Sequence, residues 1–170
     1  MNKILKGRVW IISDKEGKKI NDIDTDMIFH NRYLAITDIS KMGQYSFDNL
    51  GGWEDFAKKA VKNDILIVGE NFGAGSSRQQ AVDCFISLGV QAIIGESFGA
   101  IYKRNAINSG LPLIEAPNIF SSGKFASGDE IEIDLKTGII KNLNNGNDFN
   151  AFKMSKVALD IYEAGGIMKL

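Results

Sequence analysis

Two hydroxyls and a guanidinium stand side by side in the segment Asn71-Phe72-Gly73-Ala74-Gly75-Ser76-Ser77-Arg78. Its two glycines allow the backbone to approach a bound molecule closely. A planar guanidinium matches the oxygens of a carboxylate or a phosphate, and a helix that follows would add its free N–H groups. The segment therefore predicts a binding site for a small anion.

Other chemistries compete for the same residues. A hydroxyl at a helix start is about as often a cap as part of a site. Phosphate is a rival anion, although the segment lacks the Gly-Lys-Ser/Thr ending of a P-loop and the third glycine of a dinucleotide fingerprint. A serine hydrolase is disfavoured, because the pattern Gly-x-Ser-x-Gly is absent and the single histidine, His30, falls in another element. Capping and phosphate binding stay open.

The elements on either side must position this segment. The apolar run from Asp64 to Val68 is typical of a strand buried on both faces. A helix is expected downstream, closing at Gly89, because one apolar face is formed by Ala81, Val82, Phe85, Ile86 and Leu88. A second apolar run covers Val90 to Gly95. Strand, helix and strand at this spacing predict a βαβ unit with parallel strands.

Three aspartates alternate with short side chains in the stretch from Asn21 to Asp26. Such residues commonly form turns or helix caps by bonding to nearby backbone amides. A calcium loop counted from Asp22 would need Gly at its sixth position and Glu at its twelfth. The chain has Met27 and Tyr33 there, so a turn or cap is favoured over calcium.

The spacing of apolar residues, together with the residues that typically begin and end helices and strands, predicts the remaining elements. Strands are expected at Lys6–Ile12 and Leu111–Glu115, and a hairpin at Asp129–Leu135 and Ile139–Leu143. Helices are expected near Ser40–Leu50, at Phe98–Ser109 with Ser97 as its cap, and at Ser155–Ala164. Trp53–Lys62 is expected to be a short amphipathic helix or a turn. The polar stretch Asn142–Asn150 is expected to be a surface loop.

Composition excludes several classes of function. The net charge is −1 and the basic residues are scattered, so neither nucleic acid nor a membrane surface is expected as a partner. No apolar run is long enough for a membrane span or a signal peptide. One cysteine, Cys84, cannot alone build a metal or iron–sulfur site, and we expect it in the core. The sequence predicts a single α/β domain over residues 1–170, located in the cytoplasm.

Three blocks together resemble one family. They are Asp22-Ile23-Asp24-Thr25-Asp26 with Arg32-Tyr33-Leu34, the segment Asn71 to Arg78, and Glu96-Ser97-Phe98-Gly99 with Arg104-Asn105-Ala106-Ile107-Asn108 and Gly110-Leu111-Pro112-Leu113. In order and spacing they are similar to the small subunit of 3-isopropylmalate dehydratase, the detached swivel domain of the aconitase superfamily. The likeness covers almost the whole chain, and the Ser-Ser-Arg block is its most specific part.

The resemblance implies a fold, a partner and a reaction. The fold is a swivel-like β/β/α domain with a mixed sheet flanked by helices. The partner is a separate large subunit carrying a 4Fe-4S cluster, in a heterodimer or heterotetramer, while this chain binds no cofactor or metal. The reaction is a dehydration and rehydration that moves a hydroxyl between adjacent carbons of a malate-like dicarboxylate, in leucine biosynthesis.

The resemblance also assigns roles to residues. Ser76 matches the serine that removes a proton from the substrate carbon, and Ser77 and Arg78 match residues that hold a substrate carboxylate. Asp26, with Asp24 and Thr25 in the same block, matches a supporting role in orienting the site. A turn-capping role is an equally good explanation of Asp26.

The segment Tyr33-Leu34-Ala35-Ile36 matches the loop that reads the variable substituent of the substrate. Homoaconitase-like members have an arginine where this chain has Ala35. A third carboxylate would lie there desolvated and unpaired, so an apolar substituent is favoured, as in isopropylmalate.

Phe29-His30, Gln79 and Ala100 depart from the family pattern. A related dehydratase acting on 2,3-dimethylmalate, citraconate/citramalate or homoaconitate therefore stays open. So does a stand-alone module that binds a carboxylate or phosphate.

Overall fold

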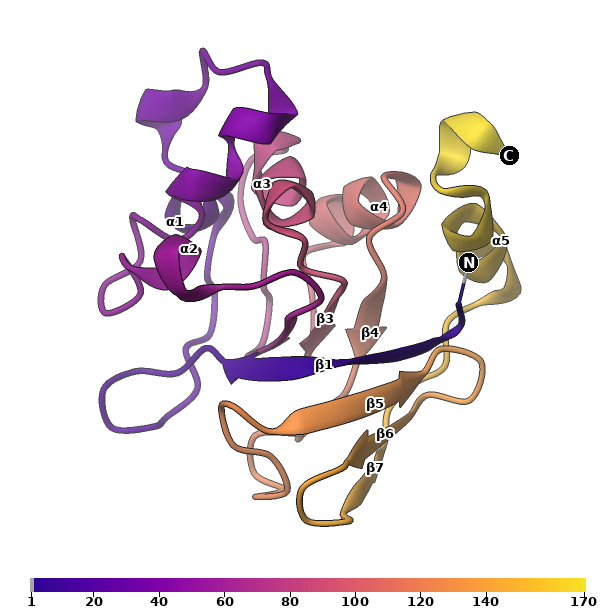
Figure 1. The fold of residues 1–170 in the computed structure, drawn as a ribbon. Coiled ribbons are helices and arrows are strands. Elements are labelled where there is room, and N and C mark those ends of the chain that lie inside the picture. Colours follow the sequence, from indigo (N-terminus) through magenta and orange to yellow (C-terminus); the bar gives the residue numbers. More distant parts are fainter. Residues whose placement is uncertain (1) are drawn as a thin grey trace.

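The computed structural model describes residues 2–170, which form a seven-stranded mixed sheet with helices around it (Figure 1). The strands are β1 (Ile4–Ile11), β2 (Ile65–Val68), β3 (Ala92–Gly95), β4 (Leu113–Glu115), β5 (Glu130–Asp134), β6 (Ile139–Asn142) and β7 (Asp148–Asn150). Their order across the sheet is β4-β3-β2-β1-β5-β6-β7. β1 therefore lies at the centre.

β1 is the strand at which the sheet changes from parallel to antiparallel pairing. It pairs in parallel with β2, where Trp10 lies opposite Leu66, and antiparallel with β5, where Lys6 lies opposite Glu132. β2, β3 and β4 continue in parallel, whereas β5, β6 and β7 continue antiparallel. The carboxyl ends of the four parallel strands thus share one edge, and ligands of open α/β sheets bind outside that edge.

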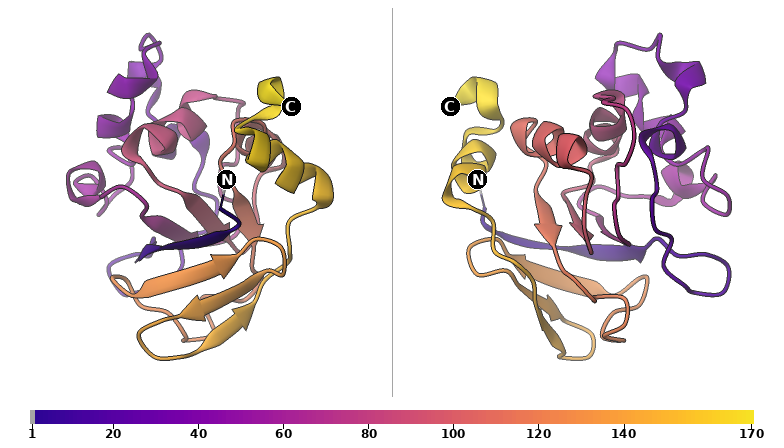
Figure 2. Two further views of the ribbon diagram at one scale, coloured as in Figure 1. Left: turned by 45° about the vertical axis from the view of Figure 1, so that its right-hand side comes forward. Right: turned by 180° about the vertical axis from the view of Figure 1, so that it is seen from behind.

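In the described part of the chain, five short α-helices accompany the sheet: α1 (Thr25–Ile28), α2 (Phe56–Lys59), α3 (Gln80–Leu88), α4 (Ala100–Asn108) and α5 (Lys156–Ala164). Four 3₁₀ turns are η1 (Asn31–Tyr33), η2 (Ile39–Lys41), η3 (Gly43–Tyr45) and η4 (Ile167–Lys169). In Figures 1 and 2, α1 to α4 stand together above the parallel strands, and α5 stands beside α4. Within residues 2–170, no helix has the length and apolarity needed to cross a bilayer.

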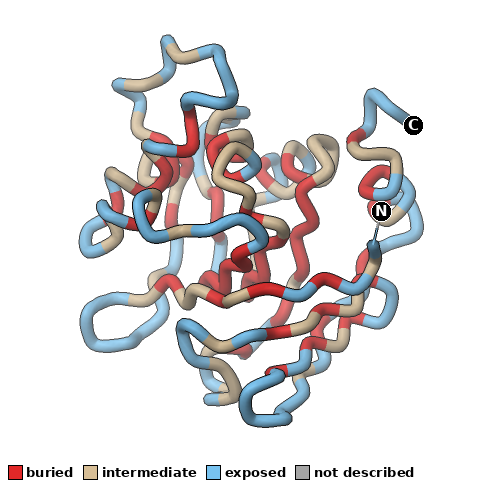
Figure 3. The backbone as a smooth tube through the Cα atoms, viewed as in Figure 1, coloured by how far each residue is buried: buried red, intermediate tan, exposed pale blue. Residues whose placement is uncertain are grey.

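Two apolar cores lie on the two faces of the parallel strands. Leu66 and Val68 of β2 belong to the core that contains α3 and α4. Ile65 and Ile67, which point the opposite way, belong to the core shared with β5, β6 and α5. Figure 3 shows the result, with buried residues along the strands and exposed residues in the outer loops. Burial of β2 on both faces is as predicted.

Several sequence predictions are confirmed. β2, α3 and β3 form the expected parallel βαβ unit, and β5 and β6 form the expected hairpin. α5 begins where expected, because the Ala158 N–H donates to Ser155 Oγ (3.1 Å). It ends at Gly165, which has a φ of +86°. The predicted α/β fold, a mixed sheet flanked by helices, is confirmed.

Three local predictions are wrong. The helix expected near Ser40–Leu50 is replaced by the turns η2 and η3. Ser97 does not cap a helix, because its Oγ accepts from the Asn71 N–H (2.8 Å) and α4 starts only at Ala100. The stretch Asn142–Asn150 is not wholly a surface loop, since its last three residues form β7 and pair with β6.

Candidate active site

The segment from Asn71 to Arg78 leaves the end of β2 at the carboxyl edge of the sheet. The Phe72 N–H donates to the Ser97 carbonyl (3.1 Å), which ties the segment to the connection that follows β3. Gly73 has a φ of +82°, and a Cβ at this position would lie 2.2 Å from the Tyr102 ring. Only glycine fits there. The backbone is therefore fixed immediately before the two serines.

Ser76 and Ser77 are exposed, so a ligand can reach both hydroxyls. The expectation that they stand at the helix start is wrong, since α3 begins at Gln80, about one turn further on. Within residues 2–170, the backbone N–H groups from Ser76 to Gln80 donate to no other group. Free N–H groups before a helix favour an anion, and neither serine is engaged in capping α3.

Thr25 joins the serine segment to the aspartate-rich block. It is buried, and its Oγ1 donates to the Ser76 carbonyl (3.0 Å) while its N–H donates to the Ala74 carbonyl (3.0 Å). Asp24 caps α1, because its Oδ1 accepts from the Met27 N–H (2.8 Å). The structure thus brings Asp24 and Thr25 next to the segment, with Asp24 acting through the local fold.

Arg78 lies against the same block. Its Nη1 donates to Asp26 Oδ1 (3.0 Å) and to the Phe29 carbonyl (2.7 Å). Only 12% of the side chain is exposed. Within residues 2–170, Nε and Nη2 donate to no other group, so two sides of the fork are available to an anion.

Asp26 has a pKa below its ordinary value. Partial burial raises the pKa, but the hydrogen bond from Arg78, the N–H of Asn31 (2.8 Å) and the charges of His30 and Arg78 together lower it further. The carboxylate is therefore ionised at neutral pH and holds the guanidinium in one orientation. Asp26 joins the site through Arg78.

The segment Tyr33–Ile36 lies beside the start of α3, because Gln80 Nε2 donates to the Leu34 carbonyl (3.3 Å). The Tyr33 ring is stacked on Tyr45, with centroids 3.9 Å apart, and its hydroxyl donates to Asp48 (2.7 Å). That hydrogen bond is the main reason why the pKa of Tyr33 is raised. Tyr33 therefore anchors the segment.

The other three residues of this segment differ in exposure. Leu34 and Ala35 are exposed, whereas Ile36 packs against the core. Leu34 and Ala35 are thus the two side chains of residues 34–36 that are open to solvent.

Asn105 also touches the site, and sequence reasoning gave it no role. It lies on α4, and its Nδ2 donates to Ser77 Oγ (3.2 Å). The two residues are far apart in the chain, so only the packing of α4 beside α3 brings them together. The block Arg104-Asn105-Ala106 was a signal of family, but nothing in it indicated a partner.

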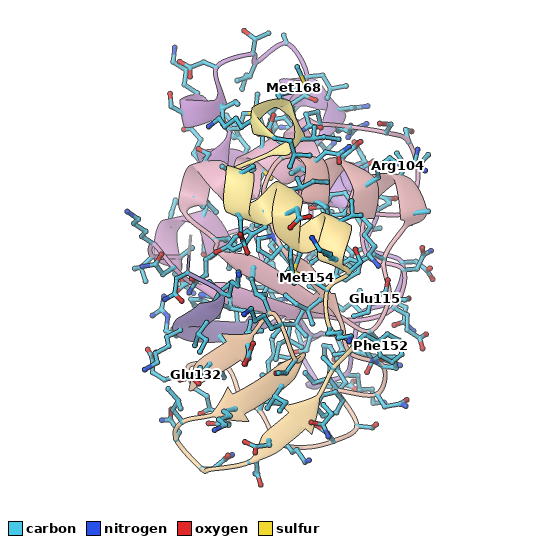
Figure 4. All side chains as sticks on the ribbon, turned by 90° about the vertical axis from the view of Figure 1, so that its right-hand side faces the viewer. Arg104, Glu115, Glu132, Phe152, Met154 and Met168 are labelled. Carbon is cyan, nitrogen blue, oxygen red and sulfur yellow. The ribbon has the colours of Figure 1, made fainter. Side chains whose placement is uncertain are left out.

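A hollow of about 500 Å³ between α4 and α5 contains none of the predicted site residues. Figure 4 looks onto this side, with Arg104 on α4 and with Glu115 and Phe152 near the start of α5. Its central polar groups are already paired, since Lys103 Nζ lies 2.6 Å from Glu115 Oε1. We therefore place the site at the serine segment.

The described residues contain no group of side chains suited to bind a metal ion or an iron–sulfur cluster. Residues 2–170 contain no group of three or more His, Cys, Asp or Glu side chains that could hold a metal ion. Cys84 is fully buried, and burial raises the pKa of its thiol to about 12. A thiol in that state is not a cluster ligand near neutral pH.

Comparison with known proteins gives a consistent result. The model of the aconitase C-terminal domain matches residues 13–118. The isopropylmalate/citramalate isomerase small subunit of Methanocaldococcus jannaschii is 44% identical over 99% of this chain and 94% of its own length. The 3-isopropylmalate dehydratase small subunit of Aquifex aeolicus is 40% identical over 96% of this chain and 91% of its own. A crystal structure of 3-isopropylmalate dehydratase from M. jannaschii superposes with a TM-score of 0.85 at 34% identity, over 98% of this chain and 92% of that one.

Proposed function

This chain belongs to the aconitase C-terminal domain family, and we propose that it is the small subunit of a hydro-lyase that interconverts 2-isopropylmalate and 3-isopropylmalate. The step would serve leucine biosynthesis. One observation carries the proposal: two exposed serine hydroxyls adjoin an arginine that Asp26 holds in place. The names of the full-length relatives supply the substrate class.

The geometry supports a division of roles along the segment. Ser77 and Arg78 would hold a carboxylate, with the free Nε and Nη2 of the guanidinium as donors. As the alkoxide, Ser76 Oγ would take the proton from the substrate carbon while the hydroxyl leaves the adjacent carbon as hydroxide, forming a double bond. The proton on Ser76 and that hydroxide together make the water that is released. A free alkoxide is far too basic near neutral pH. The open N–H groups from Ser76 to Gln80 would stabilise the negative charge on that oxygen.

We propose that the catalytic centre is completed by a large subunit carrying a 4Fe-4S cluster, in a heterodimer or heterotetramer. Support comes from the relatives, which are named small subunits. Within residues 2–170 no side-chain group fits a cluster. Both serines face outward, which suits a substrate shared with a second chain. We propose the cytoplasm as the compartment.

Replacement of the proposed base tests the main function. With the large subunit present, Ser76→Ala should lower kcat for 3-isopropylmalate dehydration by about 100-fold or more, the usual contribution of a positioned base. Formation of the unsaturated product is followed by ultraviolet absorbance. Ser121→Ala is the matched control, because Ser121 is an exposed serine whose hydroxyl, within residues 2–170, bonds only to the Asn118 carbonyl (3.0 Å). Near wild-type activity of Ser76→Ala would rule out the base assignment.

Citramalate is a second candidate substrate, because the M. jannaschii relative is named an isopropylmalate/citramalate isomerase. Citramalate carries one methyl group in place of the isopropyl group, and 2,3-dimethylmalate carries two methyl groups on adjacent carbons. The exposed side chains of Leu34 and Ala35 are apolar, so they could contact the isopropyl group of isopropylmalate or the methyl group of citramalate. The ratio of kcat/KM for the two diacids decides between them.

Ala35→Arg tests whether the loop reads the substituent. The guanidinium would pair with a third carboxylate, so kcat/KM should shift by at least about tenfold from isopropylmalate toward homoaconitate-type tricarboxylates. Thr37→Arg is the control, since it adds the same charge at an exposed position two residues on. Unchanged preference in Ala35→Arg would mean that another segment reads the substituent.

A further inference from the structure

The five residues from Ser76 to Gln80 are bonded alternately to two flanks of the site. Every second residue bonds toward α1 and η1. The Ser76 carbonyl accepts from Thr25, Arg78 donates to Asp26 and Phe29, and Gln80 donates to the Leu34 carbonyl. This flank holds one backbone carbonyl and two long side chains.

The intervening two residues bond toward α4. Ser77 Oγ accepts from Asn105 Nδ2 (3.2 Å). Gln79 Nε2 donates to Ser109 Oγ (2.8 Å) and also to Asp83 Oδ1 within α3 (3.0 Å). Asn105 and Ser109 lie one helical turn apart on the same side of α4 and its end. The serine segment is thus held between two supports, and α4 is one of them.

α4 is firmly attached to the core, so Asn105 is a fixed point. Tyr102 is buried, and its hydroxyl donates to the Ala81 carbonyl of α3 (2.8 Å). Ala106, the neighbour of Asn105, is also fully buried. A side chain on this helix therefore presents its amide at a defined place beside Ser77.

The direction of the hydrogen bond between Asn105 and Ser77 determines what the Ser77 hydroxyl can do. The Asn105 amide nitrogen can only donate, so the Ser77 oxygen is the acceptor. The hydroxyl hydrogen of Ser77 then points elsewhere and is free to be donated. A carboxylate needs a donor. We propose that Asn105 is a positioning residue that keeps Ser77 oriented as a donor to the substrate carboxylate.

The inference rests on the proposed function, in which Ser77 binds the substrate. Asn105→Ala, assayed with the large subunit, should raise KM for 3-isopropylmalate about threefold to tenfold, the equivalent of one hydrogen bond, with kcat changed less than about twofold. Asn105→Asp should raise KM further, because its carboxylate accepts the Ser77 hydrogen and repels the substrate. Asp keeps the shape of Asn, so this variant tests polarity even if alanine loosens α4.

A double-mutant cycle shows whether Asn105 acts through Ser77. In a Ser77→Ala background, Asn105→Ala should change KM by less than about twofold. Asn108→Ala is the matched control, since Asn108 lies on the same helix and its side chain makes no hydrogen bond within residues 2–170. Its KM should equal that of the wild type.

Two results would overturn the inference: an unchanged KM in Asn105→Ala, or the same rise in KM with and without Ser77. Failure of the proposed function looks different, because the wild-type pair would then dehydrate neither isopropylmalate nor citramalate. That result would remove both proposals. If the wild-type pair acts on citramalate alone, the double-mutant cycle of Asn105 and Ser77 is measured with citramalate as substrate.

Discussion

Arg78 is a charged side chain with little exposed surface, and Asp26 is what makes this position tolerable. A buried charge is unfavourable unless it is paired and hydrogen-bonded, and here both partners lie on α1 or just after it. Both contacts are made by Nη1, so they hold the arginine in place and leave Nε and Nη2 open toward a ligand. The role of Asp26 is thus to orient Arg78.

Asp26→Asn should weaken substrate binding by loosening Arg78. We expect KM to rise by about threefold to tenfold, because an amide oxygen replaces a charge-assisted acceptor. Asp160→Asn is the control, since it removes an exposed ion pair with Lys156 (3.2 Å) on α5, away from the serine segment. Equal KM values in the two variants would separate Asp26 from the site.

The same variant has a pH signature. The pKa of Asp26 is lower in the folded chain, so the unfolded chain binds more protons and stability from this group rises with pH. The contribution is complete above the unfolded-state pKa of about 4 and is lost as pH falls through the lower folded-state value. It should be at most about 1 kcal/mol, because the carboxylate is partly exposed. Urea unfolding of wild type and Asp26→Asn should differ at pH 7 and converge near pH 2.

At the scale of elements, the connection from β2 to α3 depends on one glycine. Gly73→Ala should destabilise the chain by about 2–4 kcal/mol, because alanine is unfavourable at a φ of +82° and its Cβ would enter the space of the buried Tyr102. Denaturant unfolding measures the change.

Gly75→Ala is the matched control for this prediction. Gly75 also has a positive φ, +92°, but the nearest atom to a Cβ there lies 3.7 Å away. Only the backbone term of about 1–2 kcal/mol should remain. Equal losses for the two variants would mean that contact with Tyr102 contributes nothing.

The elements that the sequence predicts well are those whose signals are local. α5 has its cap at Ser155 and its left-handed glycine at Gly165, and both function as expected. The helix expected near Ser40–Leu50 fails for reasons outside its own sequence. Phe47 has a φ of +62° and its N–H donates to the Ile28 carbonyl (2.9 Å), while the Gly43 N–H donates to Ser87 Oγ of α3 (3.1 Å). Tertiary packing decides both positions.

In the site, too, local sequence signals predict some features and tertiary packing determines the others. The sequence points to Ser76, Ser77 and Arg78, because their residue types and neighbours carry the signal. It does not show that Arg78 is held by Asp26 or that Ser77 accepts from Asn105. These pairs join segments that only the fold brings together, so no local pattern contains them.

At the scale of the whole molecule, both serines lie on an exposed surface, and residues 2–170 contain no group of His, Cys, Asp or Glu side chains that could hold a metal ion. Expressed without its partner, the chain should therefore show neither dehydratase activity nor bound iron. The single thiol is buried with its pKa raised to about 12, which leaves no thiolate for a cluster. Iron analysis and the ultraviolet assay, before and after mixing with the large subunit, check this. A stoichiometric cluster in the isolated chain would contradict the division of labour between subunits.

The alternating supports of residues 76–80 restrict how this protein can change over evolution. A one-residue deletion or insertion would exchange the flanks, so a residue that now meets α1 would face α4 and the reverse. Like the register of a strand, the length of this loop has a parity that must be kept. New substrate preferences should therefore arise in this lineage by replacing side chains, while the number of residues between Gly75 and α3 stays even.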